Sequence, residues 1–124
     1  MYREKYFPTW KNIIQLYISN ANVGFARCVV SDFKVPITLH MFTDASCNAF
    51  GAVCYIVTMG KNPTSNNLCS KSKIKPLGKK LTIPKLELSG VLLGLELIKN
   101  LIDNKDEVNF ESVHLWADAL CVLN

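Results

Sequence analysis

The feature that most constrains the fold is a long apolar helix pattern between two strand patterns. Residues 84–103 open on Pro84, a residue favoured at the first helical position, and leucines recur through the segment at helical spacing. The segments at 37–44 and 112–117, on either side of it, both have strand character. A strand, a crossover helix and a second strand of the same sheet form a parallel, right-handed unit. The sequence therefore predicts an α/β fold.

Three strand patterns precede this helix and lie close together in the sequence. Residues 37–44 alternate apolar and polar side chains, 51–59 form a continuous apolar run, and 68–74 can form a third strand. Short connections between strands favour an antiparallel meander. Upstream of the strands, an amphipathic helix is predicted at 10–18, with Thr9 as its N-cap.

The long helix carries a broad apolar face and two glycines. Gly90 and Gly94 lower its helix propensity, which favours a role in close packing against a sheet. Four leucines share one face and three more are expected to widen it: Leu86, Leu93, Leu97 and Leu101, then Leu88, Leu92 and Leu95.

The composition indicates a folded chain with no membrane-spanning or secretory segment. Hydrophobic residues make up 49% of the 124 residues and charged residues 19%, which disfavours disorder. The apolar run at 49–59 is about half of what a membrane span needs, and the first residues lack a signal-peptide core. We therefore expect an intracellular, cytoplasmic protein with no membrane partner. The five cysteines lack C-x-x-C spacing, so buried free thiols are expected rather than zinc ligands or disulfides.

The net charge of +4 is unevenly distributed along the chain. No acidic residue lies between Asp44 and Glu87, whereas seven of the fourteen basic residues do. Such a segment suggests a polyanionic partner, but composition alone favours a lysine-rich loop that only faces water.

Three carboxylates are expected to meet at one edge of the predicted sheet. Asp44 and Asp118 end two strands, and Glu87 lies in the first turn of the helix that crosses between them. Converging carboxylates repel one another unless a cation is bound, and oxygen ligands favour Mg²⁺ or Mn²⁺. Each residue also has a simpler interpretation, because Asp forms turns and helix caps and Glu is favoured at helix N-termini.

The remaining polar and aromatic candidates are expected to be structural. His40 and His114 lie in strand patterns, and neither is expected to neighbour a second histidine. The large aromatic residues are expected in the core rather than as base-stacking platforms: Trp10, Phe42, Phe50, Tyr55 and Trp116.

Three segments resemble the motifs of retroelement ribonuclease H domains, in the form found in BEL/Pao retrotransposons. Phe42–Ser46 with Ala49–Val53 resembles the first catalytic strand and its hairpin. Leu81–Leu88, preceded by Ser70–Pro76, resembles the second motif, and Ser112–Asp118 resembles the third. The order Asp, Glu, Asp differs from that of integrases, in which the Glu comes last. The resemblance covers residues 37–124, and more weakly the helix before them.

The resemblance implies a fold, a reaction and a set of site residues. The fold is a ribonuclease H-like α/β mixed sheet, with three antiparallel strands plus a parallel strand after a crossover helix. The reaction is endonucleolytic hydrolysis of the RNA strand of an RNA–DNA hybrid with two Mg²⁺ or Mn²⁺ ions. Asp44, Glu87 and Asp118 would be the metal ligands, and Asp44 would bridge both ions. The residues expected near the hybrid are Ser46, Asn48, Lys71, Thr82 and Lys85.

The resemblance also implies how the chain is organised. Residues 1–36 are expected to be a helical connection to an upstream reverse transcriptase region of the same polyprotein, and 37–124 a partial ribonuclease H-like domain. The family has a fourth carboxylate after the third motif, for which this chain offers no counterpart, so we expect a fold that is incomplete at its C-terminus. Two alternatives stay open: a non-catalytic remnant that binds nucleic acid or a protein partner, and a structural module whose carboxylates are incidental.

Overall fold

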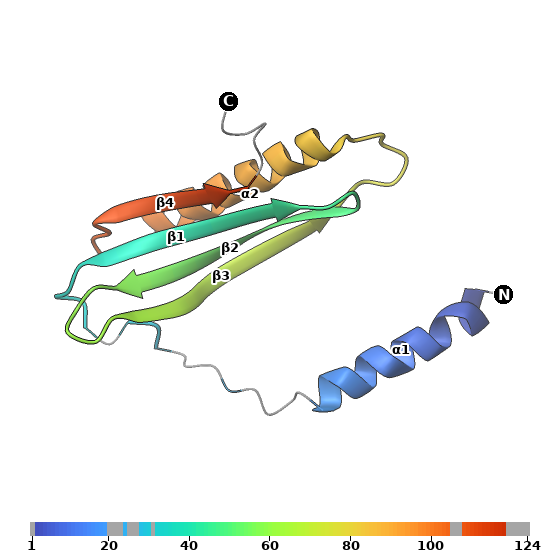
Figure 1. Cartoon of the computed structure of the whole chain (residues 1–124), viewed down its shortest axis with the longest axis horizontal. Helices are drawn as coiled ribbons and strands as arrows, with labels where there is room; N and C mark the ends of the chain where they lie inside the picture. The colour runs from blue at the N-terminus through green and yellow to red at the C-terminus, as the bar shows by residue number, and fades with distance from the viewer. Residues whose placement is uncertain (1, 20–23, 25–27, 31, 105–107, 119–124) are drawn as a thin grey trace.

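A computed structural model of the chain describes residues 2–19, 24, 28–30, 32–104 and 108–118. Four strands form one mixed sheet, a long helix covers one of its faces, and a second helix lies apart from it (Figure 1). The elements in chain order are α1 (Tyr2–Ser19), β1 (Ile37–Ala45), β2 (Ala49–Thr58), β3 (Thr64–Ile74), α2 (Ile83–Asp103) and β4 (Ser112–Ala117).

The sheet has the order β3-β2-β1-β4, with both kinds of strand pairing. β2 pairs antiparallel with β1 and with β3, whereas β4 lies parallel to β1. This confirms the prediction of an antiparallel meander followed by a crossover through α2 to a parallel strand. The mixed sheet with its two helices has the α/β architecture of a ribonuclease H-like domain.

Two glycines let α2 lie very close to β1. A Cβ at Gly94 would lie 2.9 Å from Thr43 Cγ2 and 3.1 Å from Met41 Cγ. A Cβ at Gly90 would lie 3.3 Å from the backbone oxygen of Asp44. Gly94 thus lies over an earlier part of β1 than Gly90 does, so α2 is antiparallel to β1. The helix therefore begins at the end of the sheet where β1 ends.

The hydrophobic core fills the space between α2 and the covered face of the sheet. Every second residue of β1 enters it, and Leu39 and Met41 are completely buried. The other core residues are Val30, Ile37, Ala52, Cys54, Ile56, Leu93 and Ile98. Leu86 is also fully buried, whereas Leu97 and Leu101 only pack against the edge of this cluster.

The cysteines match the prediction only in part. The described cysteines are free thiols, but Cys28 and Cys47 are exposed rather than buried. Cys54 lies opposite Cys69 on the neighbouring strand. Burial, with a smaller effect of the adjacent Cys69 thiol, raises the pKa of Cys54 to about 12. Cys121 lies outside the described residues.

The starts of α1 and β3 differ most from those predicted, and β2 is Ala49–Thr58 rather than 51–59. α1 begins at Tyr2, so Thr9 is not its N-cap and Pro8 lies inside the helix. A proline removes only one intrahelical hydrogen bond, and the residues before it include good helix formers. β3 begins at Thr64 rather than at residue 68, because polar residues 64–67 pair with β2 and Thr64 bonds the Thr58 hydroxyl over 2.7 Å.

The apolar face of α2 is narrower than predicted. Leu88, Leu92 and Leu95 are 50%, 54% and 46% exposed, because the sheet contacts only the opposite side of the helix. Helical periodicity cannot indicate which apolar residues will have a neighbour to pack against. The sequence from Asp118 to Asn124 also predicts the start of a further helix, and residues 119–124 lie outside the described residues.

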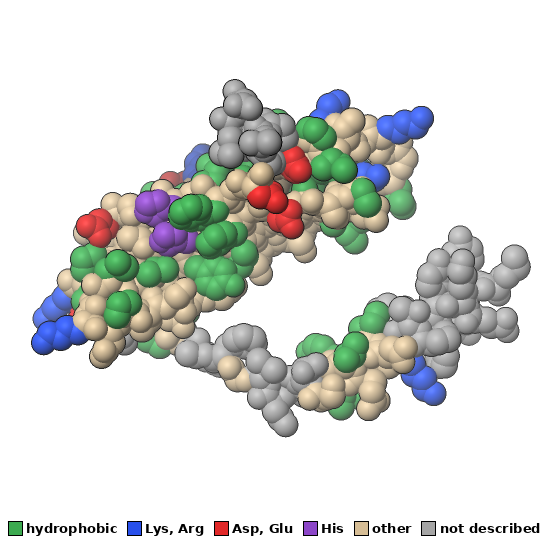
Figure 2. All heavy atoms as spheres, in the orientation of Figure 1, with side chains coloured by type: hydrophobic (Ala, Val, Ile, Leu, Met, Phe, Trp, Pro, Cys, Tyr) green, Lys and Arg blue, Asp and Glu red, His purple; other side chains and the backbone are tan. Residues whose placement is uncertain are grey.

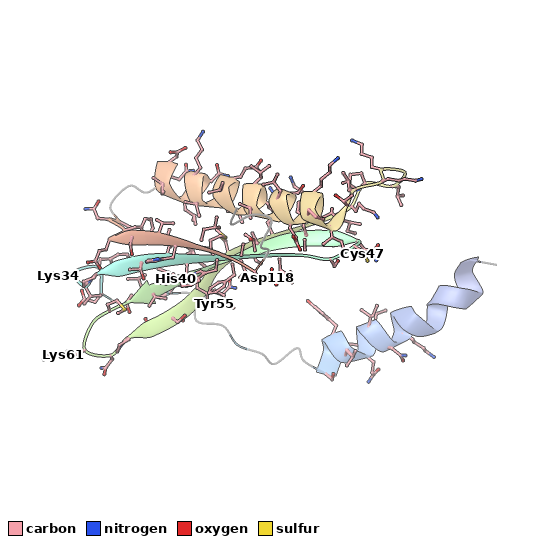
Figure 3. The ribbon with its side chains drawn as sticks, turned by 45° about the horizontal axis from the view of Figure 1, so that its top comes forward. Lys34, His40, Cys47, Tyr55, Lys61 and Asp118 are labelled. Carbon is pink, nitrogen blue, oxygen red and sulfur yellow. The ribbon has the colours of Figure 1, made fainter. Side chains whose placement is uncertain are left out.

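The second face of the sheet is left open among the described elements. The only helix with extensive contacts to the sheet is α2, while α1 lies apart from it (Figure 3). On this open face, Phe42 and Trp116 remain 43% and 49% exposed. The open face also carries the side chains that the functional argument concerns.

Candidate active site

Asp44 and Asp118 lie at equivalent positions on two neighbouring parallel strands. The register pairs Phe42 with Trp116 and Thr43 with Ala117, and each aspartate is the next residue along its strand. Adjacent strands are about 4.8 Å apart, so the two backbones are within reach of a shared ligand. Both aspartates are exposed. The prediction that Asp44 and Asp118 belong to the ends of two adjacent parallel strands is therefore confirmed, with Asp118 directly after the last residue of β4, whereas the site that they would form stays a prediction.

Glu87 approaches the same end of the sheet from α2. It lies three residues before Gly90, whose backbone packs on that of Asp44. Residues three apart share a helix face and are separated by about 4.5 Å along the axis. Because α2 is antiparallel to β1, Glu87 lies beyond Gly90 toward the end of β1, and it is partly buried there.

A tight turn after Asp44 orients the residues that follow it. The Ser46 amide donates to the Ala49 carbonyl over 2.7 Å, and the amides of Asn48 and Ala49 donate to the Ser46 hydroxyl. One carboxylate oxygen of Asp44 accepts the Ala45 amide over 2.7 Å. Ser46 is thus a turn residue in this structure, and its hydroxyl is engaged by the turn itself.

The donor set suits a hard cation, although the side chains are not gathered around one point. Three carboxylates supply the oxygen ligands that Mg²⁺ and Mn²⁺ prefer. Figure 2 shows acidic side chains at one end of the sheet, beyond the two histidines. Within the described part of the chain, however, no three His, Cys, Asp or Glu side chains are close enough to hold a metal ion. The backbone placement and the donor chemistry fit a divalent cation, whereas its binding requires the side chains to rearrange.

Two hollows contain several of the predicted substrate-binding residues, and the first of them is also lined by Asp44. The first, of about 540 Å³, lies across β1, β2 and β3, and brings Ser46 and Lys71 to the same cavity as Asp44. The second, of about 560 Å³, is lined by Asn48 and by the loop after β3, including Lys75, Lys79 and Lys80. The Lys75 amide donates to the Asn48 carbonyl over 2.7 Å, which joins this loop to the turn after β1.

The two remaining predicted contacts lie at the start of α2 and outside both hollows. Thr82 is the N-cap residue by position, but its side chain makes no capping hydrogen bond. Lys85 is exposed in the first turn of the helix. Both therefore lie at the carboxylate end of the sheet, and neither is brought against Asp44.

The interpretation of the histidines was wrong in one respect, because they are direct neighbours in space. His40 pairs with His114 in the β1–β4 register, and their rings stack with centroids 4.8 Å apart. The Trp116 indole N–H donates to His40 Nδ1 over 3.1 Å. The sequence contained a usable signal, since each histidine precedes its strand-end aspartate by four residues. Aligning Asp44 with Asp118 also aligns the histidines.

The aromatic residues of the open face form a ladder rather than a buried core. Trp116 stacks on Phe42 and on His40 at centroid distances of 6.1 and 6.0 Å, and Tyr55 meets Phe42 edge-on. The prediction that Phe42 and Trp116 are buried was therefore wrong, while Phe50 does pack against the core. These rings contact one another while Phe42 and Trp116 stay about half exposed. The side chain of Trp10 lies outside the described residues.

The sheet order, the crossover helix and the aligned aspartates define a ribonuclease H-like domain. Comparison with protein families matches residues 2–119 to the Pao retrotransposon-like RNaseH-like domain, and the chain belongs to that family. Domains of the ribonuclease H-like kind generally use divalent metal ions and bind RNA–DNA hybrids. No curated protein matches the chain. Neither described helix combines the length and the apolar character that a membrane crossing requires.

Proposed function

We propose that this domain contributes to a metal-dependent endonuclease that cleaves the RNA strand of RNA–DNA hybrids. The observation that carries the proposal is the parallel register of β1 and β4, which sets Asp44 beside Asp118. Glu87 completes a set of three carboxylates at the same end of the sheet. Such a set would hold divalent cations if its side chains converged, because bound cations offset the repulsion between carboxylates.

Each carboxylate has a distinct role in this proposal. Asp44 lies between the other two in the fold, since α2 packs on β1 and β4 pairs with it. Asp44 is therefore the residue that would contact both of two bound ions, with Glu87 and Asp118 each contacting one. When bound, Mg²⁺ or Mn²⁺ would lower the pKa of an attacking water and compensate charge on the leaving oxygen.

The residues around the carboxylates would bind the backbone of the hybrid. Ser46 and Lys71 share a hollow with Asp44, and Asn48 shares the second hollow with three lysines. Lysines that contact phosphates release counterions, so hybrid binding should weaken as salt increases. Thr82 and Lys85 would extend the same contact surface at the start of α2. Recognition would rest on groove shape and 2′-hydroxyls rather than on base sequence.

The domain would work as one part of a polyprotein. We assign residues 1–36 to a helical connection with an upstream reverse transcriptase region, and 37–124 to the ribonuclease H-like unit. α1 has exposed apolar residues at Ile13, Ile14 and Ile18 and lies apart from the sheet, which supports a contact with another part of such an assembly (Figure 1).

The proposal is tested by titrating the chain with Mg²⁺ while its backbone amides are followed by NMR. We expect shifts confined to residues around Asp44, Glu87 and Asp118, together with cleavage of a labelled hybrid. Asp103→Asn at the far end of α2 is the matched control for Asp44→Asn. If Mg²⁺ shifts no signal near the three carboxylates, the metal site is refuted.

A second candidate function is supported by the side-chain positions. The described carboxylates are not gathered closely enough to hold a metal ion, which agrees with a non-catalytic domain that binds nucleic acid or a protein partner. That function predicts hybrid binding through the lysines that is unchanged by Mg²⁺, by EDTA or by Asp44→Asn. A purely structural module predicts neither metal binding nor hybrid binding.

A further inference from the structure

His40 holds two hydrogen bonds that define which of its nitrogens carries the proton. Its Nδ1 accepts the Trp116 indole N–H over 3.1 Å, and its Nε2 lies 3.2 Å from the Thr38 hydroxyl. An indole nitrogen can only donate, so Nδ1 must be unprotonated. His40 is therefore the neutral tautomer with its proton on Nε2, which donates to Thr38.

The bond from Trp116 attaches β4 to β1 close to the aspartates. Trp116 lies two residues before Asp118 on the same face of β4. β4 has only six residues, and most of its side chains are exposed, so packing holds it weakly. The other side-chain bond between these strands, from the Thr43 hydroxyl to the Trp116 carbonyl, is longer at 3.4 Å. These two side-chain bonds add to the backbone ladder that pairs β4 with β1, and the indole–imidazole bond is the shorter of the two.

We infer that His40 and Trp116 form a proton-sensitive clamp that holds the Asp118 end of β4 in place beside Asp44. A proton added at Nδ1 would leave two N–H groups facing each other over the present 3.1 Å, and the bond would be lost. The clamp is closed while the His40 imidazole is neutral and opens when the ring gains a second proton. His40 and Trp116 are thus positioning residues, and their role in catalysis rests on the proposed function.

The surroundings of His40 do not favour the charged ring. On β4 it faces His114, whose own Nε2 pairs with the Ser112 hydroxyl over 2.9 Å, and on β2 it faces Tyr55. Among the described residues, no Asp, Glu, Lys or Arg occupies the neighbouring positions of this face in β1, β2 or β4. Asp44 and Asp118 are four residues further along their strands, about 13 Å away at about 3.3 Å per residue. Figure 3 labels His40, Tyr55 and Asp118 on the sheet.

One interaction opposes the clamp's opening. The face of a tryptophan attracts cations, and the His40 and Trp116 ring centroids are 6.0 Å apart. That separation is at the outer limit of a cation–π contact, whereas the hydrogen bond has good length. A second proton on the stacked His114 would add repulsion at 4.8 Å. We therefore expect the loss of the hydrogen bond to outweigh the cation–π attraction, so that protonation of His40 opens the clamp.

The clamp is tested on the metal-free chain, in a Trp10→Phe background that leaves Trp116 as the only tryptophan. NMR should find His40 protonated on Nε2 at pH 8. Between pH 8 and pH 5, the indole signal of Trp116 should shift, and the exchange protection of β4 amides should fall about three- to tenfold, the worth of one hydrogen bond. His40→Asn keeps an acceptor near the Nδ1 position but cannot be protonated, so it should keep β4 protected at both pH values. His114→Asn is the matched control and should keep the transition.

Several results would overturn the clamp. One is the finding of a proton on Nδ1 of His40 at pH 8. Another is a His40→Asn variant whose β4 amides still lose exchange protection between pH 8 and pH 5. If His40→Asn does not fold, Trp116→Phe tests the same bond, because phenylalanine keeps an aromatic ring and lacks the N–H. In this variant the exchange protection of the β4 amides should be low at both pH values. Mg²⁺ titration at pH 8 separates the two proposals. A Trp116 transition without Mg²⁺ binding leaves the clamp intact and refutes the metal site, and the reverse result refutes the clamp alone.

Discussion

The two faces of the sheet are made from alternate residues of the same strands, yet they have different physical character. Met41 points to the covered face and is completely buried beneath α2, whereas its neighbour Phe42 is 43% exposed on the open face. The covered face consists of aliphatic residues and small residues that let α2 approach. The open face carries the aspartates, the histidines and the aromatic ladder. The comparison indicates that stability depends mainly on the covered face. The proposed site draws on both faces, because Asp44 belongs to the open face by strand alternation and Glu87 comes from α2 on the covered face.

Asp44→Asn is the largest expected effect and tests the chemical half of this comparison. Bound ions contribute several kcal/mol to phosphodiester hydrolysis, so cleavage of hybrid should fall about a thousandfold or more. The melting temperature without metal should stay equal or rise, because repulsion among the carboxylates is reduced while the Ala45 amide keeps an acceptor. Cleavage with Mg²⁺ and melting without it are the two measurements. Retained cleavage would exclude Asp44 as the bridging ligand.

Met41→Ala and Phe42→Ala test the structural half with adjacent residues. Met41 is fully buried, so its truncation should cost about 3 kcal/mol of unfolding free energy. Phe42 is 43% exposed and should cost about 1 kcal/mol, mainly from its contacts with Trp116 and Tyr55. Urea unfolding of both variants gives the comparison. Equal losses would mean that the open face is as well packed as the covered one.

Replacing Lys71, Lys73 and Lys75 by alanine tests whether the basic segment contacts phosphate. If each contacts one phosphate, the slope of log affinity against log salt should flatten by about 0.9 per lysine. Lys34, Lys61 and Lys99 provide a control triple with the same change in charge; Lys34 and Lys61 lie at the opposite end of the sheet from Asp118 (Figure 3). A similar slope in the parent and the Lys71, Lys73, Lys75 variant would identify the segment as a solvated loop.

Gly94→Ala is the smallest expected effect and tests how closely α2 approaches the covered face. Alanine gains about 1 kcal/mol of helix propensity, but its Cβ would lie 2.9 Å from Thr43 Cγ2 and 3.1 Å from Met41 Cγ. We expect a net loss of about 1 kcal/mol in unfolding free energy, within the range of overpacked cores. Thr43→Ser removes Cγ2 and should recover part of the loss in the double variant. A gain in stability from Gly94→Ala alone would show that α2 lies further from β1 than it does in this structure.

Local periodicity and turn chemistry predicted most of the fold. The bounds of β4 and the end of α2 agree with the pattern, and β1 differs by one residue at its end. The start of β3 was missed because residues 64–67 look like a loop until β2 supplies hydrogen-bond partners. The exposed leucines of α2 were placed wrongly for a related reason, since periodicity describes a face but not its neighbour.

Some features of the candidate site were likewise predictable from the sequence, and others were not. The crossover rule and the family resemblance together predicted that Asp44 and Asp118 would be neighbours, and the placement of Gly90 beside Asp44 brings Glu87 toward them. The roles of these residues and of the substrate contacts stay predictions. The histidine pair was overlooked although the same alignment implies it, because the two residues are 74 positions apart by their numbering.

The sequence by itself determined the element types, the parallel crossover and the positions of the carboxylates, because these depend on local spacing and on the handedness of the chain. Only the tertiary structure decided which leucines are buried, how closely α2 lies on β1, and that His40, His114 and Trp116 share one ladder. Those properties depend on contacts between distant segments, whose distances and hydrogen bonds have no counterpart in the order of residues along the chain.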